Sequence, residues 1–303
     1  MRFIWSIIGM LPALAAAAGE EERWDLAVVV SGVIQHGEGA TRMTARCELE
    51  PRFAIGPDDE LYIHIEGGEG DGFDLNGDAA PSGGALGICE IRYLHRVSGG
   101  RAVIEAGKLC LGGPGCGAPD EAIAFDGNEY ANDERVQFLA DAFVNNPALE
   151  FPEETPAVAV RFSPAETVEV SAALADAEAN WNDLAKEVFA IAEVNLKPRT
   201  TRGGNYRLYA WSDGLGVSLD QELADGVGIF VRYGRRHSDA AEAWSAGVQA
   251  GRMGLAYGRT TDAAYEHQAE VYVAGERVSL HGQWARNADG DVWLVGARTC
   301  LSF

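Results

Sequence analysis

Ser279 and His281 are the two side chains whose types and spacing could support catalysis. Residues two apart in a strand share one face, so a hydroxyl nucleophile would lie beside an imidazole base. Such a site also needs an orienting partner, which the sequence does not identify. The sequence contains no GxSxG, HExxH or phosphate-binding glycine loop. We therefore predict that the protein is not an enzyme, and an enzyme built on this pair is the alternative.

Five cysteines could form disulfides or bind a metal: Cys47, Cys89, Cys110, Cys116 and Cys300. In an exported chain they allow at most two disulfides and one free thiol. Cys110 and Cys116 are the nearest pair and would close a short glycine-rich loop, although Cys89 could equally pair with one of them. A zinc site at this pair is disfavoured, because no histidine and no CxxC lies nearby.

A second metal motif lies between residues 70 and 84. Asp74, Asn76 and Asp78 alternate like the oxygen ligands of a calcium loop. The expected glycine after the third ligand is Ala79, and the distant bidentate glutamate is missing. We therefore predict no metal and no cofactor.

The N-terminus has the layout of a cleavable secretory signal. Arg2 precedes an apolar stretch over 3–15, small residues follow to Gly19, and the acidic sequence begins at Glu20. The apolar stretch is shorter than the roughly 20 residues that a membrane-spanning helix needs. We predict a signal peptide over 1–18 and one domain over 19–303.

The charge of the chain limits its partners. The sequence has 24 basic and 46 acidic residues and a formal net charge of −22. This balance argues against nucleic acid and against electrostatic binding to an acidic lipid surface. Neutral and cationic solutes remain as candidates.

Most of the chain alternates between apolar and polar residues with period two. In the segment 291–303, Trp293 and Val295 share one face, whereas Leu294 and Arg298 share the other. About sixteen such segments follow one another, and short turns alternate with longer connections. An even number of strands with turns at one rim and loops at the other is typical of an outer-membrane barrel.

A secreted β-sandwich would show a similar alternation in each strand, so aromatic placement matters. Trp244, Tyr257, Trp284, Trp293 and Phe303 share the apolar faces, which favours a membrane interface. Those faces are nearly free of charge apart from His95. The sequence therefore favours an all-β fold, a transmembrane antiparallel β-barrel of about sixteen strands, over a sandwich.

The longest connection, over 110–155, is expected to narrow the barrel. Asn132 or Asp133 could cap a helix in which Val136, Leu139 and Phe143 recur at helical spacing. We predict that this helical loop folds inward, because long structured loops are usually functional. A cap standing above the rim is the alternative.

Polar side chains on the opposite strand faces, and one in the loop, are predicted to line the pore. They could bind sugar hydroxyls weakly enough for release. The alternative for each side chain is that it has no contact with a solute and is only solvated by water or paired with a charge on the neighbouring strand. The predicted pore-lining residues are Glu48, Glu50, Arg52, Glu66, Arg92, Arg96, Asn132, Arg207, Trp211 and Arg232.

Three blocks of sequence resemble the carbohydrate-selective porins of the OprB family. They are GNYRLYAWSDGLGVSLDQELADGVGIFVRYG over 204–234, FDGNEYANDERVQFLADAFVNNPALEFP over 125–152, and EGGEGDG over 66–72. The second block follows Gly107 and Lys108, which resemble the end of the family's GK-ending strand. The chain departs from the family in its shorter length and in the cysteine-bearing insertion over 110–116.

The resemblance implies a sixteen-stranded, water-filled barrel through which sugars diffuse passively past a weak binding site. It also implies that the protein lies in the outer membrane of a Gram-negative cell, with lipid around the barrel. A homotrimer is one possible assembly of the chain. A general or cation-preferring porin is the alternative, since net charge does not say which charges stand at the narrowest ring.

Overall fold

The structure is a computed structural model that describes residues 24–79, 84–112, 122–133, 135–179, 186–198, 202–261 and 263–303. The predicted signal peptide over 1–18 and Cys116 lie outside these residues.

Sixteen strands account for most of the described chain. In the first half they are β1 (Trp24–Gly37), β2 (Ala40–Ala54), β3 (Asp59–Asp71), β4 (Gly87–Val97), β5 (Ala102–Leu109), β6 (Thr155–Ala165), β7 (Val168–Asp176) and β8 (Val188–Leu196). In the second half they are β9 (Gly204–Trp211), β10 (Gly214–Ala224), β11 (Val227–Arg236), β12 (Glu242–Ala250), β13 (Met253–Thr260), β14 (His267–Ala274), β15 (Val278–Asn287) and β16 (Gly290–Ser302).

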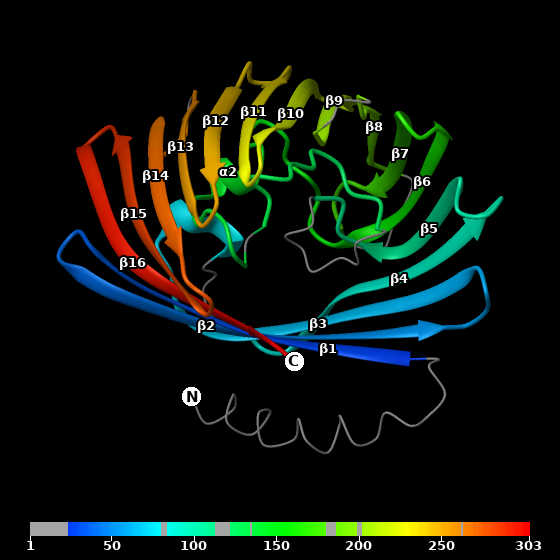
Figure 1. The fold of residues 1–303 in the computed structure, drawn as a ribbon, viewed down its shortest axis with the longest axis horizontal. Coiled ribbons are helices and arrows are strands. Elements are labelled where there is room, and N and C mark those ends of the chain that lie inside the picture. The colour runs from blue at the N-terminus through cyan, green and yellow to red at the C-terminus, as the bar shows by residue number, and fades with distance from the viewer. Residues whose placement is uncertain are drawn as a thin grey trace.

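The strands form one closed antiparallel barrel, seen as a ring in Figure 1. Each strand pairs with its neighbours in sequence, and β1 closes the ring against β16 with Val33 opposite Arg298. Closure leaves no sheet edge unpaired, which a sheet in hydrocarbon requires. The predicted all-β barrel of sixteen strands is confirmed. Among the described residues, no helix is long and apolar enough to cross a membrane.

The outward face carries aliphatic side chains between two groups of aromatic ones. Trp293 is 67% exposed and pairs with Trp284 near the rim of the longer connections. Phe162 and Tyr206 are exposed near the opposite rim. This arrangement matches an apolar band bordered by aromatic girdles. His95 also faces outward, but it lies near the end of β4 and its Nδ1 is 2.8 Å from an Asp59 oxygen.

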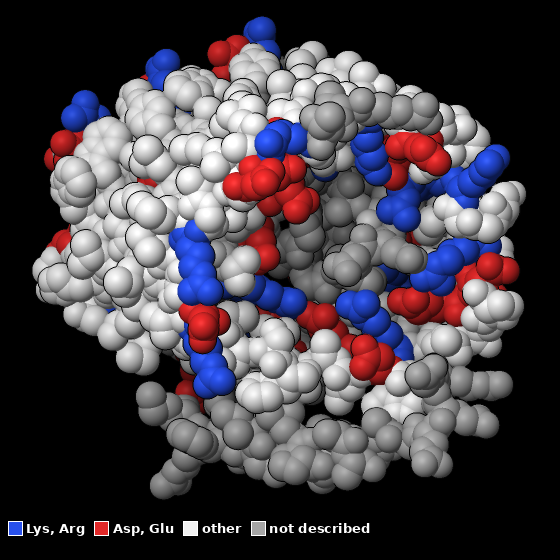
Figure 2. Space-filling model, viewed as in Figure 1, with Lys and Arg blue, Asp and Glu red and all other residues white. Residues whose placement is uncertain are grey.

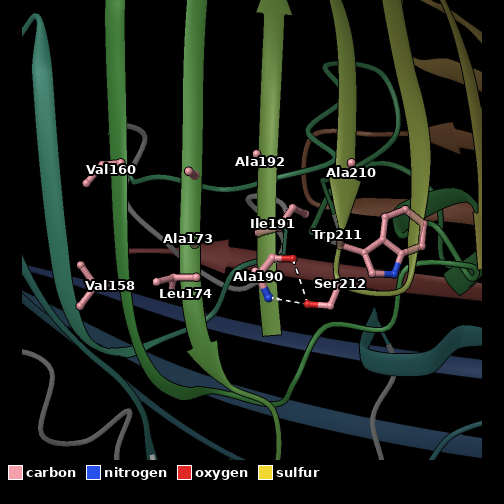
Figure 3. A pocket seen from close by; sticks show the side chains of 11 residues that line it. Val158, Val160, Ala173, Leu174, Ala190, Ile191, Ala192, Ala210, Trp211 and Ser212 are labelled. Atoms are coloured by element: carbon pink, nitrogen blue, oxygen red, sulfur yellow. Dashed lines mark hydrogen bonds between the residues drawn. The ribbon is translucent and has the colours of Figure 1, made fainter. Parts of the chain in front are cut away.

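Small outward residues make one part of this face concave. Ala172, Ala190, Ala192 and Ala210 lie on neighbouring strands β7, β8 and β9 and line an apolar hollow of about 600 Å³, beside Leu174 (Figure 3). The hollow opens outward, so it belongs to the lipid-facing surface and not to the pore.

The connections alternate in length as the sequence predicts, with exceptions. One rim carries the connections 72–86, 110–154 and 177–187, and the other carries 55–58, 98–101 and 166–167. The rim of long connections also has three tight turns, at 38–39, 212–213 and 288–289. The chain therefore places its longest loops on the first half of the barrel.

The described parts of two of these connections lie inside the ring (Figure 1). The connection 110–154 includes α2 (Asp141–Val144), and the connection 72–86 includes η1 (Asp74–Ala79). Phe138 and Phe143 of the first are fully buried against Phe230 on the inner wall. A second apolar cluster packs Phe125 and other residues of the same connection against β4 to β9.

The helix predicted from Asn132 or Asp133 is wrong. The only α-helix in the described part of this connection is the four-residue α2, whose N-cap residue Ala140 makes no side-chain capping bond. Asp133 instead makes a local turn, accepting the backbone N–H of Arg135 at 2.8 Å. Val136 is 51% exposed and does not share an apolar face with Phe143.

Candidate functional site: the pore wall and its inner loop

The connection 110–154, called the inner loop below, is attached to the wall by charged side chains. Arg232 on β11 is 1% exposed and donates to the carbonyls of Phe143 and Asn145 and to the side-chain oxygen of Asn132. Its Nε lies 3.0 Å from a carboxylate oxygen of Asp126. One guanidinium thus holds three separate points of the loop, because its donors point in several directions.

Asp126 is the loop's own buried charge. It accepts a hydrogen bond from the Tyr209 hydroxyl at 2.6 Å, and its backbone N–H donates to Glu193 at 3.0 Å. Burial raises the pKa of the Asp126 carboxyl, although the nearby Arg232 opposes this shift. The residue therefore depends on its partners on β8, β9 and β11 to remain buried.

A second attachment lies on β14 and β16. Arg298 donates to the carbonyls of Gln137 and Phe138 at 2.5 and 3.3 Å. The N–H of Leu139 donates to Glu270 at 2.9 Å. The N–H of Gln137 bonds to the Asp133 carbonyl at 2.9 Å in a single turn, but the carbonyls of Gln137 and Phe138 and the N–H of Leu139 bond to the wall, so no helix continues from that turn through residues 137–140.

A third attachment fixes the start of the loop. Arg92 on β4 is fully buried between Glu90 and Glu105 and donates to the Cys110 carbonyl at 3.1 Å. The Cys110 N–H donates a hydrogen bond to the Glu90 carboxylate at 2.7 Å, and the Ile123 N–H donates to the Glu105 carboxylate at 3.0 Å. The charges on β4 and β5 therefore pair with one another and with loop backbone.

Arg135 is the loop's own cation facing the wall. Its Nη2 donates to both Glu48 and Glu50 on β2, which are almost fully buried. The Arg135 side chain is 29% exposed, so it borders the water of the lumen. The sequence prediction did not include this residue, although a basic residue in an acidic loop is a signal for an ionic contact.

The inner wall also makes room for the loop by using glycine. A Cβ on Gly228 of β11 would lie 2.0 Å from the ring of Tyr130, and one on Gly234 would lie 2.5 Å from the Asn146 amide. Any side chain at these two positions would displace the loop.

Four predicted pore-lining residues reach accessible space. Arg52 is 35% and Arg96 25% exposed, and the latter pairs with Glu60 at 3.0 Å. Glu66 is 24% exposed, and Arg207 is 12% exposed beside Asp220. Figure 2 shows a hollow on one face of the ring with acidic and basic side chains around it.

The other six predicted residues lie between the wall and the loop. Glu48, Glu50, Arg92, Asn132, Trp211 and Arg232 are all buried. In this conformation each can act on a solute only through the position of the loop. Direct solute contact by any of the ten residues stays a prediction.

Ser279 and His281 do meet, and they have an orienting carboxylate. Ser279 Oγ lies 2.6 Å from His281 Nε2, and His281 Nδ1 lies 2.8 Å from Glu270 Oε1. Glu270 also accepts loop N–H groups, so its charge is used to hold the loop. The cavity beside Ser279 measures about 50 Å³, which is room for water but not for an acyl substrate.

Two of the donors in the metal motifs found in the sequence have other partners in the described part of the chain. In η1, the Asn76 side chain bonds to Gln35 and Gln283 of the wall, and so its oxygen is not free for a calcium ion. Cys110 is disulfide-bonded, whereas Cys47, Cys89 and Cys300 are free thiols. Pairing of Cys89 with Cys110 is therefore wrong.

Comparison with solved structures places the fold among the porins. A structure of Pseudomonas putida OprB at high pH matches with a TM-score of 0.70 at 13% identity, covering 92% of this chain and 94% of the other. The low-pH structure of that protein matches with a TM-score of 0.66 at 14% identity, covering 97% of this chain and 96% of the other. A porin triple mutant from Rhodopseudomonas blastica matches with a TM-score of 0.61 at 10% identity, covering 92% of this chain and 100% of the other.

This chain has the porin fold. The resemblance to OprB that the sequence suggests is thereby confirmed at the level of the fold. Neither a protein-family profile nor a curated protein sequence matches the chain.

Proposed function

We propose that the protein is an outer-membrane porin through which carbohydrates diffuse passively. The observation that supports it most is a closed sixteen-stranded barrel that is apolar outside and charged inside, with a long loop bound to the inner wall. Its likeness to OprB over nearly the whole length adds to this support. In the proposal the barrel domain covers 19–303 and follows a cleaved signal peptide over 1–18.

Sugar preference is supported by the accessible polar groups. Arg52, Arg96 and Arg207 offer several donors each, and Glu60 and Glu66 offer acceptors on partly exposed side chains. Weak hydrogen bonds of this kind slow a sugar without trapping it. Tyr62 and Trp211 are buried, so the proposal rests on hydrogen bonding and not on aromatic stacking.

Single-channel conductance in planar bilayers tests the proposal, with glucose and maltose added to the folded protein. Stepwise current that sugar blocks supports a carbohydrate channel, and Arg52→Ala or Arg96→Ala should weaken the block. Arg259→Ala is the matched control, because this arginine is exposed on the outer face and pairs with Glu266. Folded protein that gives no current steps would overturn the proposal.

A general or cation-preferring porin is the second candidate. It would give current steps that sugars do not block and a reversal potential that shifts with the cation gradient. The −22 net charge does not decide between the two candidates, because many carboxylates are paired or lie on the rims.

Assembly as a homotrimer stays a prediction, which analytical ultracentrifugation in detergent can test.

A further inference from the structure

A cluster of three different ligand types lies on the inner wall between β3 and β4. One ligand atom each of His64, Glu66 and Cys89 lies within 4.8 Å of the others. These residues do not contribute to the attachments of the inner loop described above. The cluster is therefore a separate feature of the wall.

A β-bulge brings the cysteine into the cluster. His64 pairs with Glu90 and Ile65 pairs with Ile88, so that Cys89 is an extra residue on β4 without a partner on β3. A bulge reorients side chains relative to the regular alternation. Without it, Cys89 would face away from Glu90, toward lipid, and could not approach His64.

His64 is the second, independent sign of a ligand. Its side chain is 3% exposed, and neither ring nitrogen has a hydrogen-bond partner. The nearest carboxylate oxygens to Nε2 are those of Glu48 at 3.7 Å and Glu66 at 3.9 Å. A buried imidazole without hydrogen bonds is costly, and the carboxylates at ion-pair distance from Nε2 are spaced so that an ion could bridge them and the ring.

We propose that His64, Glu66 and Cys89 bind a divalent transition-metal ion of the Zn²⁺ class, with Glu48 in reach as a fourth ligand. An imidazole nitrogen, a thiolate and carboxylate oxygens are the donors that Zn²⁺ takes, whereas Ca²⁺ and Mg²⁺ require oxygen alone. Ligand atoms in a tetrahedral zinc site lie about 3.4 Å apart, as follows from its bond lengths. The observed nitrogen-to-oxygen distances exceed this by a few tenths of an ångström, and the ligand atoms of the cluster, the Cys89 sulfur included, lie within 4.8 Å of one another, so the cluster contracts on binding.

The neighbouring arginines fit this site. Arg46 donates at 3.3 Å to Glu66 Oε2, the same oxygen that lies 3.9 Å from His64 Nε2, so the metal would take the other oxygen, Oε1, of this carboxylate. Such an outer partner fixes the orientation of a ligating carboxylate. Arg135 contacts Glu48, so the ion and the inner loop compete for that carboxylate. On binding, the Cys89 S–H bond breaks, its proton passes to solvent and a metal–sulfur bond forms, so affinity rises with pH.

The experiment is titration of CoCl₂ and then ZnCl₂ into the folded full-length protein in detergent, followed by absorption spectroscopy. One bound Co²⁺ should give a thiolate-to-cobalt charge-transfer band and the strong visible bands of tetrahedral geometry, and Zn²⁺ should displace it. Cys89→Ser should abolish the charge-transfer band. His64→Gln should weaken binding by about tenfold or more.

Cys300→Ser is the matched control, since Cys300 is a free thiol on β16 that is not one of the proposed ligands, and its loss should leave the band in place. Circular dichroism confirms that each variant is folded, and Glu66→Gln replaces His64→Gln if the latter fails to fold. Folded wild-type protein that binds no Co²⁺, or a band that survives in Cys89→Ser, would overturn the proposal. The readout does not depend on channel activity, so it stands or fails apart from the proposed function.

Discussion

The inward charges act first on the backbone of the inner loop. Arg232, Arg298 and Glu270 bond to loop carbonyl and N–H groups that no regular helix or strand satisfies. A buried backbone group without a partner costs as much as a lost hydrogen bond, so an irregular loop inside a barrel needs such side chains. Many of the wall charges are thus partners of the loop, and only some reach accessible space.

Replacing Arg232 tests this view. Arg232→Ala leaves Asp126 buried without its cation and frees the carbonyls of Phe143 and Asn145. Removing one partner of a buried pair costs about 3–5 kcal/mol. We expect that loss in the free energy of unfolding, measured by urea titration in lipid vesicles.

Arg235→Ala is the control, because that side chain lies on the same strand and is 52% exposed. It should change stability by less than about 1 kcal/mol. Equal losses for the two variants would contradict the role assigned to Arg232.

The sequence predicts the direction of Arg232 but not its partners. Alternation with Val231 and Tyr233 turns the arginine inward, which needs only local information. Its contacts with Asn132 and Asp126 span 100 and 106 residues. No local pattern specifies contacts of that range, which depend on how the loop lies inside the closed barrel.

Among the elements, the strands follow their pattern and the irregular segments do not. Alternation in β16 predicts that Leu294 and Arg298 are buried inside and that Trp293 is exposed outside, as the structure has them. The helical spacing of Val136, Leu139 and Phe143 predicts a helix that does not form. There, bonds from the wall to backbone groups replace the bonds that a helix would make.

The rim loop 237–241 provides a test by pH. Hydrogen bonds from Arg236 lower the pKa of the exposed Asp239 to about 2. Because the pKa is below the unfolded value of about 4, the loop's ionic stabilisation is present above pH 4 and is lost as pH falls through 2. NMR titration of the Asp239 carboxyl carbon checks this. In an Asp239→Asn variant the step with a midpoint near 2 should disappear from the loop signals, and a midpoint near 4 for Asp239 in the wild type would contradict the interpretation.

The apolar band makes a prediction about the strands themselves. Val295 is 62% exposed in the middle part of β16, whereas Val278 is 50% exposed at the first residue of β15. If the band lies in lipid, Val295→Arg should cost about 2–4 kcal/mol and Val278→Arg about 0–1 kcal/mol. Urea unfolding in vesicles measures both. Equal costs would show that the two positions meet the same solvent.

At the scale of the whole molecule, fold and selectivity depend on different information. Barrel closure follows from alternation, an even strand count and alternating connections, all readable from the sequence. Selectivity depends on which charges remain accessible once two connections occupy the interior. The net charge of −22 does not contain that information, since Glu48 and Glu50 already face Arg135.

Arg135 is therefore a residue at which the charge balance of the pore can be changed from the inner loop, without altering a strand of the barrel. Arg135→Ala removes one positive charge from the lumen and exposes the carboxylates of Glu48 and Glu50 to water and ions. The reversal potential in a salt gradient should move toward that of a cation-selective channel, and the shift should fall at high salt because exposed charges are screened. Arg259→Ala on the outer face should leave the reversal potential unchanged. No shift in Arg135→Ala, with sugar block retained, would mean that the permeation path does not pass between the inner loop and β2.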